Sequence, residues 1–180
     1  MALPTDEDIL IQRLREEKTR RETFTELVKA YSQPLYWHIR RMVVSHDDAD
    51  DLLQNTFIKA WTGIDGFLGN AKVLTWLYRI ATNEALTFLS RTPDAATDNA
   101  EACAEQLEAD PWFDGNEIET RLQAAIQTLP PKQRMVFNMK YFEDMKYEDI
   151  SNILGTSVGA LKASYHLAVK KISSFFSDDI

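Results

Sequence analysis

Aromatic, basic and amide residues recur at helical spacing in the stretch that runs from position 72 to position 83. On a helix with about 100° per residue they fall on one side, opposite a continuous apolar face. The residues of this side are Lys72, Trp76, Arg79, Ile80 and Asn83, and Phe67 precedes them in a loop bounded by glycines. Such a face suits single-stranded nucleic acid, because aromatic rings stack on unpaired bases while Lys and Arg contact phosphates. The alternative interpretation is a second packing contact with the preceding helices.

A second polar face lies on a helix predicted over about 47–61. The side of this helix that faces away from its apolar residues carries Asp51, Gln54, Asn55 and Ile58. A mixed polar face that bears one isoleucine is typical of a surface that docks on a protein partner, and its acidic character favours a basic one.

The acidic run HDDADD at 46–51 raises the alternative of a metal site with His46 as one ligand. Acidic residues in the first turn of a helix are already favoured by the helix macrodipole. No second group of His or Cys residues completes a coordination shell, because the three histidines are scattered along the chain. We therefore expect no metal and no other cofactor.

A third face follows a turn at Gly155, which suits the position just after a helix end. Two short helices joined through such a turn form a helix-turn-helix, whose second helix enters the major groove of DNA. The cap and the outward side of this second helix carry Thr156, Ser157, Gly159, Lys162, Ala163, His166 and Lys170. Small residues near its start permit a deep fit, while Lys162 and His166 can donate to bases or phosphates. The alternative is that this side of the helix is an ordinary solvent-exposed surface whose lysines contact only water.

No arrangement of residues in the chain predicts catalysis. Ser and His residues do not fall in a nucleophile elbow, and neither a Walker loop nor a dinucleotide loop is present. The single Cys103 cannot build a disulfide framework, which fits a reducing compartment. No apolar run approaches the roughly 20 residues that span a bilayer, and the N-terminus lacks the pattern of a signal peptide. We therefore expect a cytoplasmic protein that is not an enzyme.

Helices must position all three faces, and nearly the whole chain has helical periodicity. We expect a helix capped by Thr5 and further helices at about 22–31, 34–44, 47–61, 73–90, 118–129, 131–142, 146–154 and 157–175. No window shows the sustained alternation of a β-strand. The sequence therefore predicts an all-α fold.

The charge distribution divides the chain into three parts. Residues 1–91 contain 12 Lys or Arg and 13 Asp or Glu, and residues 117–180 contain eight of each. Residues 92–116 contain seven acidic residues and no Lys or Arg, with Pro93, Pro111 and little apolar periodicity. Like charges at this density extend a chain. We therefore predict two small helical domains, at 1–91 and 117–180, joined by a flexible acidic linker at 92–116.

Two blocks of the sequence resemble a known family, the extracytoplasmic-function (ECF, group IV) sigma factors of bacterial RNA polymerase. DADDLLQNTFIKAW (48–61), GFLGN (66–70) and TWLYRIATNEA (75–85) are similar to the second conserved region of that family. LPPKQRMVFNMKYFEDMKYEDISNILGTSVGALKASYHLAVKKI (129–172) is similar to its fourth region. The resemblance implies a region-2-type helical bundle and a region-4-type helix-turn-helix. It also implies a sigma factor that binds core RNA polymerase and directs promoter recognition and transcription initiation.

The resemblance assigns a role to each face. Asp51, Gln54, Asn55 and Ile58 would dock on the clamp helices of the largest polymerase subunit. Phe67, Lys72, Trp76, Arg79, Ile80 and Asn83 would meet the −10 element and trap an unstacked base of the opened strand. Thr156, Ser157, Gly159, Lys162, Ala163, His166 and Lys170 would enter the major groove at the −35 element. A member of this family also implies an anti-sigma partner, often membrane-bound.

The last helix departs from the pattern of many relatives. They carry arginines where this chain has Ser164, Leu167 and Val169. This difference leaves Lys162, His166 and Lys170 as the main donors to DNA.

Two other functions compete with the sigma interpretation. A stand-alone helix-turn-helix regulator needs a basic footprint, because affinity for DNA scales with the phosphates that a protein neutralises. Both predicted domains are close to neutral, which disfavours such a regulator. A helical adaptor without nucleic-acid binding would explain the docking face but not the face around Trp76. DNA binding without polymerase would favour the regulator, and polymerase binding without transcription would favour the adaptor.

Overall fold

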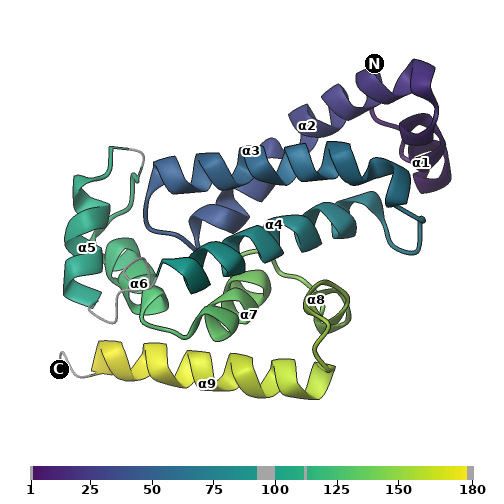
Figure 1. Ribbon diagram of the computed structural model, residues 1–180. Helices are drawn as coiled ribbons and strands as arrows, with labels where there is room; N and C mark the ends of the chain where they lie inside the picture. The colour runs from purple at the N-terminus through teal and green to yellow at the C-terminus, as the bar shows by residue number, and fades with distance from the viewer. Residues whose placement is uncertain (1, 93–99, 112, 178–180) are drawn as a thin grey trace.

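The computed structural model describes residues 2–92, 100–111 and 113–177, and no strand occurs among them. The helices are α1 (Glu7–Arg15), α2 (Glu17–Arg40), α3 (His46–Gly63), α4 (Val73–Arg91), α5 (Ala100–Ala109), α6 (Glu117–Gln127), α7 (Pro131–Tyr141), α8 (Tyr147–Leu154) and α9 (Val158–Ser177), with a 3-10 turn, η1 (Ile64–Gly66), after α3. The predicted all-α fold class is confirmed. Helices α2, α3 and α4 pack on one another, α1 packs on α2, and α6 to α9 form a second group (Figure 1).

Polar side chains begin the first helices. The side chain of Asp6 accepts hydrogen bonds from two backbone N–H groups of α1, so the cap lies one residue after the expected Thr5. The hydroxyl of Ser45 accepts from the N–H of Asp48 at 3.2 Å and caps α3. Carboxylates in a first turn are stabilised by the positive end of the helix dipole. Within the described ranges, no three His, Cys, Asp or Glu side chains are grouped so that they could hold a metal ion.

Helix α2 corrects one prediction. The sequence predicts two helices separated near Pro34, but the structure has one helix of 24 residues with this proline inside it. A proline inside a helix costs about 3 kcal/mol, because it removes an N–H donor and crowds the preceding turn. The stripe formed by Leu27, Leu35 and Ile39 is fully buried on both sides of the proline. Burial of each such side chain contributes about 1.5–3 kcal/mol, which outweighs the local cost.

The acidic stretch 92–116 also differs from expectation, although residues 93–99 and 112 lie outside the described residues. Its central part forms α5, a helix that the charge pattern of this stretch does not predict. Cys103 and Leu107 lie one turn apart and are almost completely buried, and α5 packs on α6. Asp110 forms an ion pair with Arg40 of α2. Burial raises the pKa of the Cys103 thiol, which favours the unreactive protonated form.

The helix-turn-helix has the local geometry that the sequence predicts. Gly155 adopts a left-handed conformation with φ of +67°, and its N–H donates to the carbonyl of Ser151 at 2.8 Å. The hydroxyl of Ser157 accepts from the N–H of Ala160 at 3.3 Å and so caps α9. Glycine adopts this conformation without the steric cost of a Cβ atom. The turn therefore sets α9 at an angle to α8, with its outer side free.

The two helical groups share one apolar core. Leu77 and Ala81 of α4 belong to the same buried cluster as Met139 of α7 and Ile150 of α8. Figure 1 shows α4 between α3 and the α7–α8 pair, and α4 packs against both. The two groups are therefore in direct contact rather than separated by the acidic stretch.

The two glycines around the turn give a matched test of this geometry. Gly155→Ala should lower the free energy of unfolding by about 1 kcal/mol, because alanine is strained at a positive φ. Gly159→Ala should raise it by up to about 1 kcal/mol, because alanine favours a helix interior and its Cβ would meet no atom within 4 Å. Urea unfolding curves measure both changes. Equal effects of the two substitutions would contradict the left-handed turn.

Candidate nucleic-acid and polymerase interfaces

The loop between α3 and α4 holds an aromatic pair at the edge of the core. The rings of Phe67 and Trp76 stack with a centroid distance of 4.7 Å and an interplanar angle of 25°. Helix α1 holds this loop in place, because Arg15 donates to the carbonyl of Phe67 at 3.0 Å. The side chain of Glu7 accepts from the N–H of Val73 and thereby caps the start of α4. The structure thus brings two of the predicted residues together, from the loop and from the helix.

An open hollow of about 370 Å³ lies beside Trp76, between the end of α3 and the outer side of α4. Its walls are formed by Lys59, Gly63, Gly66, Trp76, Ile80, Asn83 and Glu84. Trp76, Ile80 and Asn83 belong to the face predicted from the sequence. A hollow with an indole wall and an amide at its edge can hold an unstacked base by stacking and hydrogen bonding.

Sequence reasoning missed the two charged residues of this hollow. Lys59 of α3 and Glu84 of α4 form an ion pair at its rim. They are 25 positions apart, and neither belongs to a motif that marks it. Only the packing of α3 on α4 places them together, so no sequence signal was available. The pair neutralises an acidic residue that would otherwise repel a nucleic-acid strand.

The remaining residues of the predicted face have different environments. Lys72 and Asn83 are exposed, whereas Ile80 and the aromatic pair are half-buried against the core. The alternative of a second packing contact is thus partly realised on this side of α4. Arg79 does not reach the hollow, because its guanidinium donates to the carbonyl of Asn152 in α8 at 2.7 Å.

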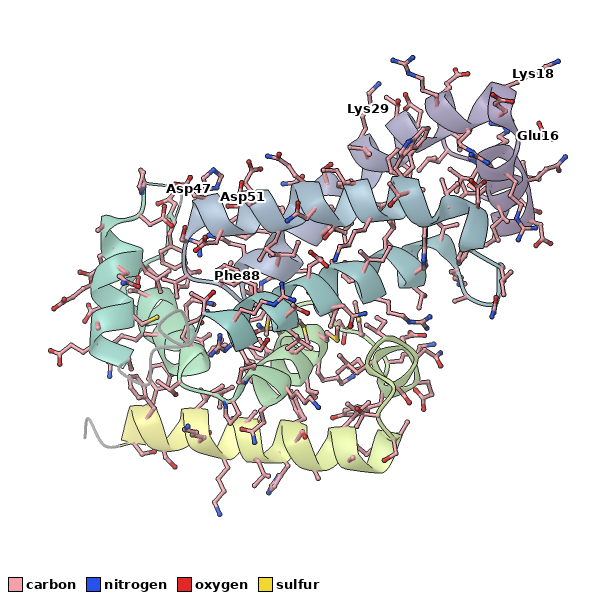
Figure 2. All side chains as sticks on the ribbon, in the orientation of Figure 1. Glu16, Lys18, Lys29, Asp47, Asp51 and Phe88 are labelled. Carbon is pink, nitrogen blue, oxygen red and sulfur yellow. The ribbon has the colours of Figure 1, made fainter. Side chains whose placement is uncertain are left out.

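The predicted docking face on α3 is open. Asp51, Gln54, Asn55 and Ile58 are all exposed, and the isoleucine is 60% exposed. Figure 2 shows Asp51 on the outer side of α3, in the N-terminal half of the helix. Trp61, which the sequence reasoning did not assign to this face, is 42% exposed one turn after Ile58 and packs edge-on against Phe24. The sequence signal for Trp61 was its position three residues after Ile58, because residues three apart are neighbours on a helix surface.

The outer side of α9 is equally accessible. Ser157, Gly159, Lys162, Ala163, His166 and Lys170 are exposed, and Thr156 is half-buried at the turn. Leu167 and Val169 are also exposed, at 53% and 37%. The buried side of the helix packs on α7, where the ring of Tyr165 stacks on Phe137 with a centroid distance of 5.8 Å. A helix held in this way can present its small and basic residues to a major groove.

Comparisons with known proteins match both halves of the chain. The family model of sigma-70 region 2 matches residues 27–92, and that of sigma-70 region 4 matches residues 119–172. The ECF RNA polymerase sigma factor SigW of Bacillus subtilis is 32% identical over 162 residues, which cover 83% of this chain and 87% of SigW. The chain belongs to the ECF sigma factors.

Further relatives agree with this assignment. The ECF RNA polymerase sigma-E factor of Escherichia coli K12 is 28% identical over 180 residues, which cover 93% of each chain. A solved structure of CnrH in complex with the cytosolic domain of CnrY has the same fold, with a TM-score of 0.71 at 23% identity over 97% of this chain and 99% of the other. The sigma factor RpoE of Bartonella quintana, solved with the anti-sigma factor NepR, has a TM-score of 0.67 at 21% identity over 87% of this chain and 98% of the other.

As an ECF sigma factor, the protein binds core RNA polymerase and directs promoter recognition and transcription initiation. The curated relatives are sigma factors, which are not enzymes. Among the described residues, no helix has the length and apolar character needed to cross a bilayer.

The hollow beside Trp76 predicts a defect in promoter opening. Loss of one stack between a base and an aromatic ring costs about 1–3 kcal/mol. We therefore expect Trp76→Ala to lower open-complex formation by roughly tenfold or more, with the affinity for core polymerase unchanged. Permanganate footprinting of the opened strand and a polymerase pull-down measure the two effects. Trp76→Phe is the control: it keeps an aromatic wall and should form open complexes nearly as well as the parent chain. A loss of polymerase binding by Trp76→Ala would contradict the prediction and place the indole in the core.

Proposed function

We propose that this ECF sigma factor divides promoter recognition between two modules, 1–91 and 117–180, joined by the acidic stretch 92–116. The first module carries the surface for the −10 element and the surface for polymerase, and the second carries the surface for the −35 element. Helices α1 to α4 lie within the first range and α6 to α9 begin within the second, which supports these boundaries. The protein works where RNA polymerase works, which is in the cytoplasm.

The −10 surface consists of the hollow and the residues around it. Trp76, supported by its stack on Phe67, forms the wall against which an unpaired base packs. Ile80 and Asn83 line the same hollow, and Lys72 lies exposed at the start of α4, where it can meet a phosphate. The stacked aromatic wall beside an open hollow is the observation that carries this proposal.

The polymerase surface is the exposed side of α3. Asp51, Gln54 and Asn55 supply polar contacts around Ile58, which is the apolar centre of the face. An exposed apolar side chain within a polar ring has the anatomy of a protein interface. By family resemblance its partner is the pair of clamp helices of the largest subunit.

The −35 surface is the outer side of α9 together with its cap. Lys162, His166 and Lys170 lie on successive turns and are exposed. A Cβ atom added at Gly159 would meet no other described part of the chain within 4 Å, apart from the backbone of its own helix and its chain neighbours. The small residues allow a close approach to the groove, and the three longer residues donate to bases or phosphates.

An anti-sigma factor is a further proposed partner. RpoE of Bartonella quintana was solved with the anti-sigma factor NepR, and CnrH was solved with the cytosolic domain of CnrY. The fold likeness of this chain to both supports a partner of the same kind, and the cytosolic domain of CnrY favours a partner attached to a membrane.

Substitution of Ile58 tests the polymerase surface. A buried carboxylate at the centre of an interface typically costs 2 kcal/mol or more, so Ile58→Asp should weaken binding to core polymerase by roughly 30-fold or more. Ile9→Asp is the matched control, because Ile9 of α1 is 45% exposed and lies outside the proposed surfaces. Fluorescence anisotropy with purified core polymerase measures both affinities. Equal affinities of the two variants would contradict the assignment of α3.

Substitution of Lys162 tests the −35 surface. Removal of one phosphate contact lowers the slope of log affinity against log salt by about 0.9. Lys162→Ala should show this change when promoter binding by the polymerase complex is titrated at several salt concentrations. Lys29→Ala, on the exposed side of α2, removes the same charge and should leave the slope unchanged.

Run-off transcription with the parent chain decides the overall function, because binding to polymerase without transcripts would indicate an adaptor.

A further inference from the structure

Helix α1 lies at the end of the first helical group where α3 leads into α4, and it packs against η1 (Figure 1). The loop 64–72 at this end carries Phe67, whose ring supports Trp76 at the wall of the hollow. The match to sigma-70 region 2 begins at residue 27, so it includes neither α1 nor the start of α2. The contacts of α1 with the loop therefore indicate what this helix does.

The first turn of α1 caps the start of α4. Lys72, the N-cap residue of α4, makes no side-chain hydrogen bond to the helix. Instead, the carboxylate of Glu7 accepts from the N–H of Val73 across 66 positions of sequence. A carboxylate in this place also faces the positive end of the helix dipole. Because Val73 is fully buried, loss of Glu7 would leave its N–H without this acceptor.

The last turn of α1 holds the middle of the loop. The guanidinium of Arg15 donates to the carbonyl of Phe67 at 3.0 Å, on the residue whose ring stacks on Trp76. Ile11 lies against the loop one turn earlier, since a Cβ atom at Gly69 would come 3.5 Å from its Cδ1 atom. Gly69 has a φ of +75°, which lets the chain turn close to α1. A hydrogen bond and close packing thus act together on residues 67–69.

Arg20 joins the corner between α1 and α2 to the same loop. Its guanidinium donates to the carbonyls of Leu14 and Arg15, at 2.8 and 3.1 Å. It also pairs with Asp65 of η1 at 2.6 Å, but this carboxylate is largely exposed, so the ion pair is a weak contact. The helix itself is firmly anchored, because Leu10 and Leu14 are almost completely buried in the core. Helix α1 is therefore a fixed support for the loop.

We propose that α1 is a positioning element for the −10 surface, with Glu7 and Arg15 as its positioning residues. They hold the loop 64–72 in the conformation in which Phe67 stacks on Trp76, so that the hollow is formed before DNA reaches it. Neither residue contacts the base in this arrangement. The inference rests on the proposed function of the −10 surface, and it adds the segment that prepares that surface.

Preorganisation gives this support a measurable effect on DNA binding. A loop that becomes ordered only when the base arrives loses conformational freedom at that step, and this loss lowers the affinity. In the parent chain α1 has already fixed the loop. Removal of one support should therefore weaken capture of an unpaired base by roughly three- to tenfold. The affinity for core polymerase should stay unchanged, because the exposed residues of α3 lie outside these contacts.

Capture of single-stranded DNA by the complex with core polymerase tests this role. The probe is a fluorescent oligonucleotide with the non-template sequence of the −10 region of a promoter that the parent chain transcribes. Glu7→Ala should weaken its binding roughly three- to tenfold. Glu7→Gln keeps an acceptor oxygen for the N–H of Val73 and should restore most of the affinity. Fluorescence anisotropy below the unfolding transitions of all variants measures both.

Asp8→Ala is the matched control for Glu7→Ala. It removes an exposed carboxylate from the same turn of α1 and should bind the probe as the parent chain does. An equal loss in Glu7→Ala and Asp8→Ala would contradict a specific role of Glu7, because the effect would then follow from charge or from the helix itself.

Hydrogen exchange in the free protein tests the positioning directly. Glu7→Ala and Arg15→Ala should each raise the exchange rates of amides in 64–73 at least roughly threefold, while amides in the middle of α3 keep their parent rates. The side chain of Arg15 is exposed, so its variant keeps the test valid if Glu7→Ala does not fold. Arg21→Ala removes an exposed positive charge from α2 and should leave the loop unchanged. Parent rates throughout the loop in Arg15→Ala would overturn the proposal.

A double-substitution cycle with Trp76→Ala separates this role from the function of the surface. If α1 acts through the aromatic wall, Arg15→Ala should weaken capture in the parent chain and add little in the Trp76→Ala chain. Full additivity of the two losses would mean that α1 acts by another route, against the proposal. Unchanged capture by Trp76→Ala alone would instead refute the proposed −10 surface, while the exchange rates of the loop still decide whether α1 positions it.

Discussion

The burial of α4 is the constraint on which the rest of the structure depends. Leu77, Ala81 and Ala85 are fully buried, and they fix the helix between α3 and the α7–α8 pair. A helix that is packed on two sides has one side left for a ligand. On α4 the remaining side carries Trp76 and borders the hollow. Arg79, on the same helix, reaches the carbonyl of Asn152 in α8 instead. One helix therefore serves the core, the proposed DNA surface and the contact between the modules.

The contact between the modules combines two kinds of interaction with different consequences. Met139 and Ile150 extend the apolar core of the first module, which favours association without fixing an orientation. The polar contacts at the end of α2 are directional, and they fix how α6 and α7 sit on it. Several buried polar atoms there have no hydrogen-bond partner among the described residues, so the interface gains less stability than its size suggests.

The charge distribution limits the affinity of the chain alone for DNA. The net charge of −8 is concentrated in residues 92–116, and the flanking parts are close to neutral. A chain without a basic excess binds DNA weakly by itself, because phosphate neutralisation supplies most non-specific affinity. In a sigma factor the polymerase contributes much of the DNA contact, so the weak affinity does not prevent function. The charge balance therefore disfavours DNA binding by the free protein.

The sequence by itself determined the features that depend on neighbouring residues. Helical periodicity, the left-handed turn at Gly155 and the cap at Ser45 are local, and the exposed faces of α3 and α9 follow from spacing alone. Tertiary structure decided what depends on burial between distant segments. It carried α2 through Pro34, folded α5 onto α6, and directed Arg79 to α8 rather than to the hollow. Local propensities contribute tenths of a kcal/mol up to a few kcal/mol, and the packing of distant side chains outweighs them where the two conflict.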